Sequence, residues 1–217
     1  MAKQIKQIIS EMALEEKIQL LTGEEMHTIA FPKYGIESVE MSDGPSGVRL
    51  VVDRPPLPGG DVAVPTASAQ AASWNPQIVE RLGNLIALNC KERQIDLLLA
   101  PGVNIQRNPL CGRNYEYYSE DPYLAGELGS AYVKGLQEYG VGTSLKHFAA
   151  NHQEIFRGVV NAEISERPLR EIYLSVFEDI VKKAKPTTVM CAYNKVNGQY
   201  CSENKKLLTD ILRTEWG

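Results

Sequence analysis

Apolar residues recur at helical spacing over several stretches of the chain. In the first 23 residues they lie three or four positions apart, with glutamates and lysines between them, which predicts one or two helices ending at Gly23. A helix is predicted to open at Asn75-Pro76, because asparagine caps helices and proline suits their first turn. Its expected apolar face comprises Ile78, Leu82, Leu85, Ile86 and Asn89. The same spacing predicts helices over residues 124–139, after the cap residue Ser165, and over residues 207–216.

Short apolar runs alternate with these helices. Residues 95–100 and 187–192 are typical of strands buried on both faces, and residues 36–41 alternate as a half-buried strand does. Helix and strand alternate about five times, which predicts an α/β fold with a parallel sheet and helices outside it. No glycine-rich phosphate turn follows the first strand, as a doubly wound sheet would require. The sequence therefore favours a (β/α)8 TIM-type barrel, incomplete, with about five strand–helix units.

Polar residues cluster directly after the predicted strands. The clusters are Asp43, residues 104–121, residues 146–157 and Tyr193-Asn194, and the third of them follows a short extended run at residues 141–145 that is predicted to be a buried strand. Two of the three histidines fall within residues 144–157. In a parallel barrel the carboxyl ends of the strands meet at one rim, which is where active sites lie. The alternative for residues 144–157 is a surface loop with incidental charges, since loops are usually polar.

The amino-acid composition limits the partners that this protein is expected to have. The chain is 43% apolar and 23% charged with a net charge of −4, and it has no basic stripe, which argues against a nucleic-acid partner. No apolar run reaches the length of a membrane span, and none follows the N-terminus as in a signal peptide, so no membrane partner and a cytoplasmic location are expected. The cysteines show no zinc spacing, so neither metal nor cofactor is expected. Free thiols are expected, with a Cys191–Cys201 disulfide as the alternative.

The polar clusters combine carboxylates with arginine, lysine and histidine. A hydroxyl donates one hydrogen bond and accepts two, so acidic and basic partners both suit a ligand rich in hydroxyls. This composition predicts a sugar site. A phosphorylated sugar is the alternative, because three of the candidate residues are arginines. The candidate residues are Asp43, Arg49, Arg113, Glu116, Lys146, His147, Glu154, Arg157 and Tyr193.

Several long motifs, in order, resemble the family 3 glycoside hydrolases, and within them the β-glucosidase branch. The motifs are Ser42-Asp43-Gly44-Pro45, Ala100-Pro101-Gly102-Val103-Asn104, Gly112-Arg113-Asn114, Lys146-His147-Phe148-x-x-Asn151 and Met190-Cys191-Ala192-Tyr193-Asn194. The resemblance runs from about residue 12 to residue 217. The related hexosaminidases carry Pro-Gly-His where Ala149-Ala150-Asn151 stands here, so N-acetylglucosamine is disfavoured.

The resemblance implies retaining hydrolysis of terminal β-D-glucosidic bonds, with β-xylosides as a second substrate class. It implies that most of the subsite for the terminal sugar, the −1 subsite, comes from this chain, with a β-glucoside or oligosaccharide bound there. Asp43 would accept bonds from the 4- and 6-hydroxyls, and Arg113, Lys146 and His147 would hold the 3-hydroxyl. Arg157 would lie near the 2-hydroxyl, beside Met190 and Tyr193. Arg49, Glu116 and Glu154 would support these contacts.

The resemblance assigns no catalytic carboxylate to residues 1–217. A retaining glycosidase uses two carboxyl groups about 5–5.5 Å apart. The family's nucleophile, an aspartate, would lie just beyond Gly217, and the acid/base glutamate in a later domain. We therefore expect an N-terminal portion of the barrel domain that is inactive alone and has the C-terminal part of the same enzyme as its partner. A non-catalytic sugar-binding protein and one subunit of a split glycosidase are the alternatives.

Several residues also have plain structural interpretations. Asp43 before glycine suits a turn, and Arg113 could pair with Glu116 or Asp121. Adjacent strand residues point to opposite faces, so Lys146 and His147 can share a ligand only if regular β geometry breaks within residues 146–149. Glu154 is expected to pair with a basic residue. Tyrosines 115, 117 and 118 could stack on a sugar, although the last two could equally be packing residues.

Overall fold

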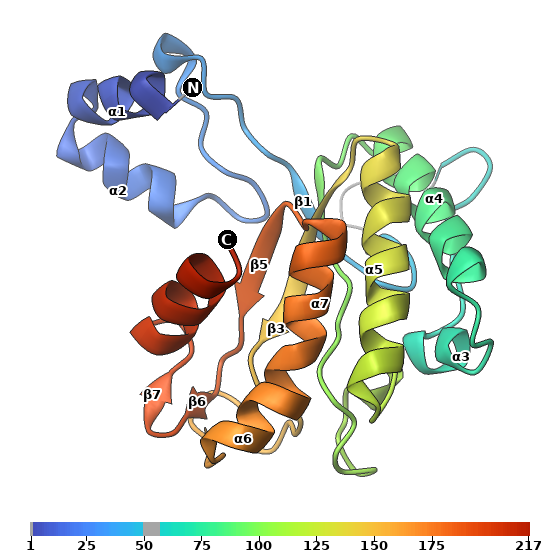
Figure 1. Ribbon diagram of the computed structural model, residues 1–217. Helices are drawn as coiled ribbons and strands as arrows, with labels where there is room; N and C mark the ends of the chain where they lie inside the picture. The colour runs from blue at the N-terminus through green and yellow to red at the C-terminus, as the bar shows by residue number, and fades with distance from the viewer. Residues whose placement is uncertain (1, 50–56) are drawn as a thin grey trace.

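A computed structural model describes residues 2–49 and 57–217 as an α/β fold around a parallel sheet. The sheet order is β1 (Met41–Asp43), β2 (Leu97–Leu99), β3 (Gly142–Phe148) and β5 (Thr188–Cys191). Three helices lie side by side across one face of it: α4 (Pro76–Glu92), α5 (Pro122–Glu138) and α7 (Ser175–Ala184) (Figure 1). The alternation of strand and helix predicted from the sequence is thus confirmed.

The other elements surround this layer pair. At the N-terminus, α1 (Ala2–Glu11) and α2 (Leu14–Thr22) form a hairpin set apart from the sheet (Figure 1). Gly23 ends α2 as predicted. The remaining helical segments are η1 (Pro32–Tyr34), α3 (Ala67–Ala71), η2 (Asn114–Glu116), α6 (Glu166–Pro168), η3 (Leu169–Leu174) and η4 (Lys206–Glu215). A second sheet has the order β4 (Asn161–Ala162), β6 (Lys195–Val196) and β7 (Gln199–Tyr200).

Helix α4 begins as its sequence predicts, but of its predicted face only Ile86 and Asn89 are buried. The Asn75 side chain accepts hydrogen bonds from the backbone of Gln77 and Ile78, with Pro76 in the first turn. The buried positions include Val79, Gly83, Ile86, Ala87 and Cys90, whereas Ile78 and Leu85 are exposed. The cause is the close approach of α5: a Cβ added to Gly83 would lie 2.8 Å from the Tyr132 carbonyl oxygen. Small residues therefore occupy the contact, and the larger ones are displaced from it.

An aromatic cluster fixes the last helical segment against the sheet. Phe148, at the end of β3, lies 5.2 Å from the Phe177 ring and 5.9 Å from the Trp216 ring, both nearly perpendicular to it. All three side chains are buried. Edge-to-face packing of this kind adds to the gain from burying apolar area. The end of β3 is therefore held from two sides, which matters because β3 also carries polar residues at its tip.

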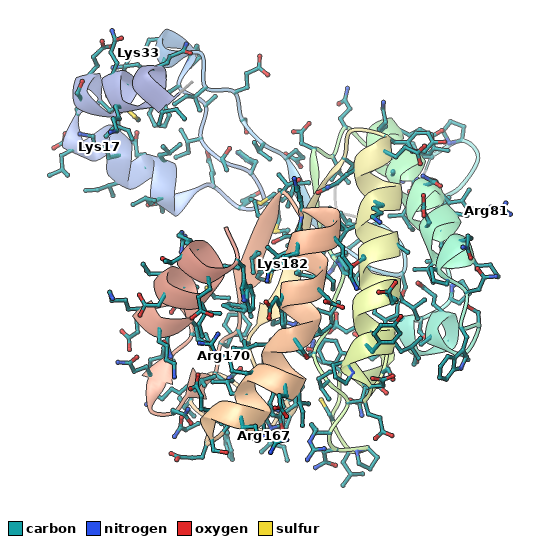
Figure 2. The ribbon with its side chains drawn as sticks, viewed as in Figure 1. Lys17, Lys33, Arg81, Arg167, Arg170 and Lys182 are labelled. Atoms are coloured by element: carbon teal, nitrogen blue, oxygen red, sulfur yellow. The ribbon has the colours of Figure 1, made fainter. Side chains whose placement is uncertain are left out.

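Charged side chains on the helices face outward. Figure 2 shows Lys17 of α2, Arg81 of α4 and Lys182 of α7 on the outside of the molecule. Several form exposed pairs one turn apart, such as Lys182 with Glu178 and Arg167 with Glu171. Pairs of this kind stabilise a fold only weakly. Among the described residues, no helix is long and apolar enough to cross a membrane.

The structure shows the predicted α/β fold with a parallel sheet, and three details of the predicted strands need correction. The main sheet is open and has four described strands, where an incomplete barrel of about five strand–helix units was predicted. The first strand, β1, overlaps the predicted residues 36–41 only at Met41 and continues to Asp43. Strand β5 is only half-buried because it forms the sheet edge. The two-residue strands β4, β6 and β7 were missed, since two residues show no periodicity. The sequence also predicts a loop rich in proline and glycine at residues 53–60, of which residues 53–56 lie outside the described residues.

The four cysteines are free thiols, and no disulfide joins Cys191 to Cys201. Cys90, Cys111 and Cys201 are buried. Burial raises the pKa of the Cys90 thiol to about 12 and that of Cys201 to about 11. Buried thiols of this kind are unreactive.

Candidate functional site

A pocket of about 500 Å³ lies at the carboxyl ends of the main-sheet strands. Every residue that the sequence predicts to contact a sugar lines it. These are Asp43, Arg113, Lys146, His147, Arg157, Met190 and Tyr193, joined by Leu99, Gly112, Tyr115 and Glu154. Residues separated by up to 150 positions in the sequence thus face one cavity.

The strands bring these side chains together. Asp43 ends β1 and pairs in register with Leu99, which ends β2. Lys146 and His147 lie near the end of β3, and Tyr193 follows β5 by two residues. Because the strands are parallel, their carboxyl ends share one edge of the sheet. This placement explains why the polar clusters after separate strands converge.

Strand β3 loses its regular pairing at the predicted place. Its register with β5 shifts between Leu145 and Phe148. The peptide bonds Lys146–His147 and Phe148–Ala149 are cis. The Lys146 and His147 side chains both line the pocket, although adjacent residues of a regular strand would point to opposite faces. The predicted break within residues 146–149 is confirmed.

A buried lysine anchors the centre of the site. The Lys146 side chain is 2% exposed, and its Nζ donates to Asp43 Oδ1 at 2.8 Å. Glu116 Oε2 lies 3.7 Å from the same nitrogen, and Glu116 also pairs with Arg113. Burial alone would raise the pKa of Asp43, but the Lys146 charge and its hydrogen bond outweigh burial and lower that pKa. Asp43 is therefore an ionised hydrogen-bond acceptor at the pocket wall.

The structure shows which of the two predicted carboxylates pairs with Arg113. Arg113 pairs with Glu116, while Asp121 accepts a hydrogen bond from the Tyr123 backbone and caps α5. Arg49 acts nearby through its backbone, whose N–H donates to the Asp43 carbonyl at 2.8 Å. It also lines a hollow next to the main pocket that includes Asp43 and Glu116. Arg49 and Glu116 therefore both lie next to Asp43, and their supporting role stays a prediction.

Arg157 and Glu154 form a second ion pair in the lining of the pocket. Arg157 Nη1 donates to Glu154 Oε2 at 2.9 Å, and the Arg113 Nε lies 4.0 Å from Glu154 Oε1. Glu154 therefore pairs with basic residues, as predicted. The Arg157 guanidinium also lies 5.1 Å from the Tyr193 ring centre, within the range of a cation–π contact. Tyr193 itself is 61% exposed, so this part of the lining is the open side of the site.

His147 is held by a shell of buried polar groups. The Asn104 side chain accepts from the His147 backbone N–H and donates to its carbonyl oxygen, both at 2.9 Å. The ring Nδ1 lies 3.1 Å from the Tyr117 hydroxyl. Burial, with help from the charges of Arg113, Lys146 and Arg157, lowers the pKa of His147 to about 2. The ring is therefore neutral at physiological pH.

The buried neutral state of His147 makes stability depend on pH. An unfolded histidine takes up a proton near pH 6.5, whereas folded His147 does so only near pH 2. Below pH 6.5 the unfolded chain binds more protons, so acidification favours unfolding by up to about 1.4 kcal/mol per pH unit. His152, whose pKa burial also lowers, adds to the slope. We expect His147→Gln to flatten the dependence of unfolding free energy on pH between about pH 6.5 and 5 in urea titrations. Equal slopes for this variant and the wild type would contradict this assignment.

Sequence reasoning missed part of the site. Leu99 and Gly112 line the pocket without any polar signal, and Asn104 and Asn151 act from behind it. Asn104 and Asn151 both stand within motifs shared with the resembling family, which is the one signal that could have found them. Of the three neighbouring tyrosines, the exposed Tyr115 lines the pocket, while Tyr117 and Tyr118 are buried.

Comparison with known proteins places the chain in a family. Residues 36–217 match the family described as "Glycosyl hydrolase family 3 N terminal domain". The chain belongs to glycosyl hydrolase family 3. It is 49% identical to thermostable beta-glucosidase B of Acetivibrio thermocellus, over all of this chain and 29% of that protein. It is 46% identical to an exo-alpha-(1->6)-L-arabinopyranosidase of Bifidobacterium longum, over 96% of this chain and 28% of that protein.

Solved family 3 structures share the fold. Beta-glucosidase 3B of Thermotoga neapolitana, in complex with alpha-D-glucose, matches with a TM-score of 0.92 and 44% identity over 99% of this chain and 32% of that one. DesR, a beta-glucosidase of Streptomyces venezuelae in complex with D-glucose, matches with a TM-score of 0.88 and 35% identity over 97% of this chain and 27% of that one. This family 3 chain therefore spans about 30% of the length of the relatives that it matches.

Proposed function

We propose that this chain carries most of the −1 subsite of a retaining β-glucosidase, which hydrolyses terminal β-D-glucosidic bonds. The observation that supports this most is the convergence of all seven predicted contact residues on one pocket. Family 3 relatives named as beta-glucosidases at 44–49% identity support the same substrate class.

The chemistry of the pocket suits one pyranose ring. Three cationic side chains donate hydrogen bonds, and the carboxylates of Asp43 and Glu154 accept them. Bonds to such charged partners are stronger than neutral ones. We assign Asp43 to the 4- and 6-hydroxyls, Arg113, Lys146 and His147 to the 3-hydroxyl, and Arg157 to the 2-hydroxyl. Tyr115, exposed at the pocket edge, is placed to stack on a ring.

We further propose that the two reacting carboxyl groups come from polypeptide outside residues 1–217. Each described carboxylate at the site is already engaged by a cation: Asp43 by Lys146, Glu116 by Arg113, and Glu154 by Arg157. A general acid must hold a proton near neutral pH, which an adjacent cation disfavours. In this proposal the C-terminal part of the same enzyme supplies the nucleophile and the acid/base, and it closes the open sheet into a (β/α)8 barrel.

Alternative sugars differ at the positions that Asp43 would contact. Xylose and L-arabinopyranose lack the 6-hydroxymethyl group of glucose, and a relative 46% identical to this chain is named as an arabinopyranosidase. A β-xyloside or an α-L-arabinopyranoside is therefore the second candidate substrate. Binding to Asp43 separates these sugars, because only glucose offers it two hydroxyls.

Calorimetric titration of the chain with D-glucose, D-xylose and L-arabinose tests the proposal. We expect saturable binding at one site, tightest for glucose. Asp43→Asn should weaken glucose binding about tenfold, the worth of one charge-assisted hydrogen bond, and xylose binding less. The matched control is Asp210→Asn, at an exposed aspartate of the last helical segment, which should bind as the wild type does. Absence of saturable binding for all three sugars would contradict the proposal.

A further inference from the structure

The buried hydroxyl of Tyr117 lies behind the pocket, between two polar side chains. It is 3.1 Å from Nδ1 of His147 and 3.3 Å from Nδ2 of Asn151. The Tyr117 side chain is fully buried and Asn151 is 2% exposed, so water does not compete for these bonds. Each hydrogen-bond donor among these three side chains therefore needs a protein acceptor, since burying a donor without an acceptor costs free energy.

The orientation of the Asn151 amide follows from its second neighbour. Its Nδ2 lies 3.2 Å from Glu154 Oε1. Glu154 also pairs with Arg157, and its carboxylate oxygens act as hydrogen-bond acceptors. The Asn151 group that faces both Glu154 and Tyr117 must then be the NH2 donor. Asn151 therefore donates a hydrogen bond to the Tyr117 oxygen.

The proton of Tyr117 has one remaining acceptor. Burial raises the pKa of Tyr117 far above its usual range, so the hydroxyl keeps its proton. Within residues 2–49 and 57–217, the acceptor that faces this proton is Nδ1 of His147. The opposite tautomer, with a proton on Nδ1, would leave the phenol proton unbonded. In that tautomer Nδ1–H could donate to the Tyr117 oxygen at 3.1 Å, which already accepts from Asn151, or over the longer 3.4 Å to Asn104 Oδ1, which already accepts from the His147 backbone.

We infer that Tyr117 and Asn151 are positioning residues that fix the Nε2–H tautomer of His147, so that its ring presents a neutral N–H donor to the pocket. Asn151 directs the Tyr117 proton, and Tyr117 in turn makes Nδ1 an acceptor. The identity of the ligand as a sugar rests on the proposed function, but the tautomer does not. A hydroxyl facing Nε2 accepts this bond and keeps its own proton for a carboxylate such as Glu154. A fourth cation is thereby avoided next to Arg113, Lys146 and Arg157.

Long-range 15N NMR of the histidine rings in the full 217-residue chain tests this inference directly. The chain has three histidines, and the variants His27→Gln and His152→Asn identify the signals of His147. We expect an unprotonated Nδ1 and a protonated Nε2 at neutral pH. A protonated Nδ1 in the wild-type chain would overturn the inference without any substitution.

Two substitutions are expected to change the tautomer of His147. Tyr117→Phe removes the donor, so Nδ1 should become protonated and turn to Asn104 Oδ1. Asn151→Asp keeps the shape but offers Tyr117 an acceptor, so the Tyr117 proton should turn away from His147 and the tautomer should again invert. The matched control is Tyr118→Phe, at a buried neighbouring tyrosine that should leave the tautomer unchanged. If Tyr117→Phe or Asn151→Asp folds and its histidine spectrum matches that of the wild type, the inference is overturned.

Sugar binding provides a separate measurement. We expect D-glucose to bind Tyr117→Phe about tenfold more weakly than the Tyr118→Phe control, because one hydrogen bond to the sugar loses its donor. An inverted tautomer with unchanged glucose affinity would overturn the positioning role. The predicted tautomer in a chain that binds no sugar at all would instead contradict the proposed function and leave the tautomer assignment standing.

Discussion

Lys146→Met is expected to lower the free energy of unfolding by about 3 kcal/mol, the low end for breaking a buried ion pair. The methionine fills a similar volume, so the loss comes from charge rather than from a cavity. Among the residues that the structure describes, the loss of Lys146 leaves Glu116 with Arg113 alone and leaves Asp43 with no cation within a hydrogen bond. The loss is at the low end because the Asp43 side chain is 40% exposed and water can solvate it.

Urea unfolding of the variant, beside a matched control, measures this effect. Lys134→Met changes an exposed lysine on the outer face of α5 and should alter stability by less than about 0.5 kcal/mol. In glucose titrations, Lys146→Met should weaken binding about 100-fold, because it removes a charged donor and disturbs Asp43. Equal stability of the two variants would show that Lys146 is not the electrostatic centre of the site.

The candidate site could be predicted from the sequence because its residues follow strands. Asp43, Lys146 and Tyr193 each stand at or just after a strand end, and parallel strands bring such ends to one edge. The break near Lys146 could also be anticipated, since two adjacent side chains cannot otherwise face one cavity. What the residue types could not indicate was Asn104, whose role depends on a backbone group 43 positions away.

Features of the fold that depend on packing were harder to predict. The predicted face of α4 was wrong at Ile78 and Leu85, which carry a strong hydrophobic signal but are exposed, while Gly83 makes the close contact with α5. A glycine has no hydrophobic signal, so periodicity cannot reveal that the backbone needs the space. Strand β5 has the apolar composition of a central strand, yet it lies at the edge of the sheet. Burial of a strand depends on its neighbours, which local sequence does not specify.

Turnover is the property in which we expect the largest difference between residues 1–217 alone and the chain joined to a C-terminal polypeptide. A retaining glycosidase loses activity without its nucleophile and its acid/base, whatever the quality of its sugar pocket. We therefore expect residues 1–217 alone to bind glucose but to release no nitrophenol from an aryl β-D-glucoside. Joining the chain at residue 217 to the polypeptide that follows the matched region of the Acetivibrio thermocellus relative should supply the missing groups. In that fusion, Lys146→Met should reduce the rate by about 100-fold or more, while Lys134→Met should leave it unchanged.

The same assay separates the alternatives. A non-catalytic sugar-binding protein would bind glucose and stay inactive in the folded fusion. One subunit of a split glycosidase would gain activity when the second polypeptide is added as a separate chain. Relative rates on aryl β-xylosides and α-L-arabinopyranosides would rank the candidate substrates.

The most direct measurement is the rate of nitrophenol release from an aryl β-D-glucoside by residues 1–217, with and without the fused C-terminal polypeptide. We predict no release by the chain alone and release by the fusion. Hydrolysis by residues 1–217 alone, at a rate that Lys146→Met abolishes, would mean that the reacting carboxylates lie within this chain and would contradict the proposal.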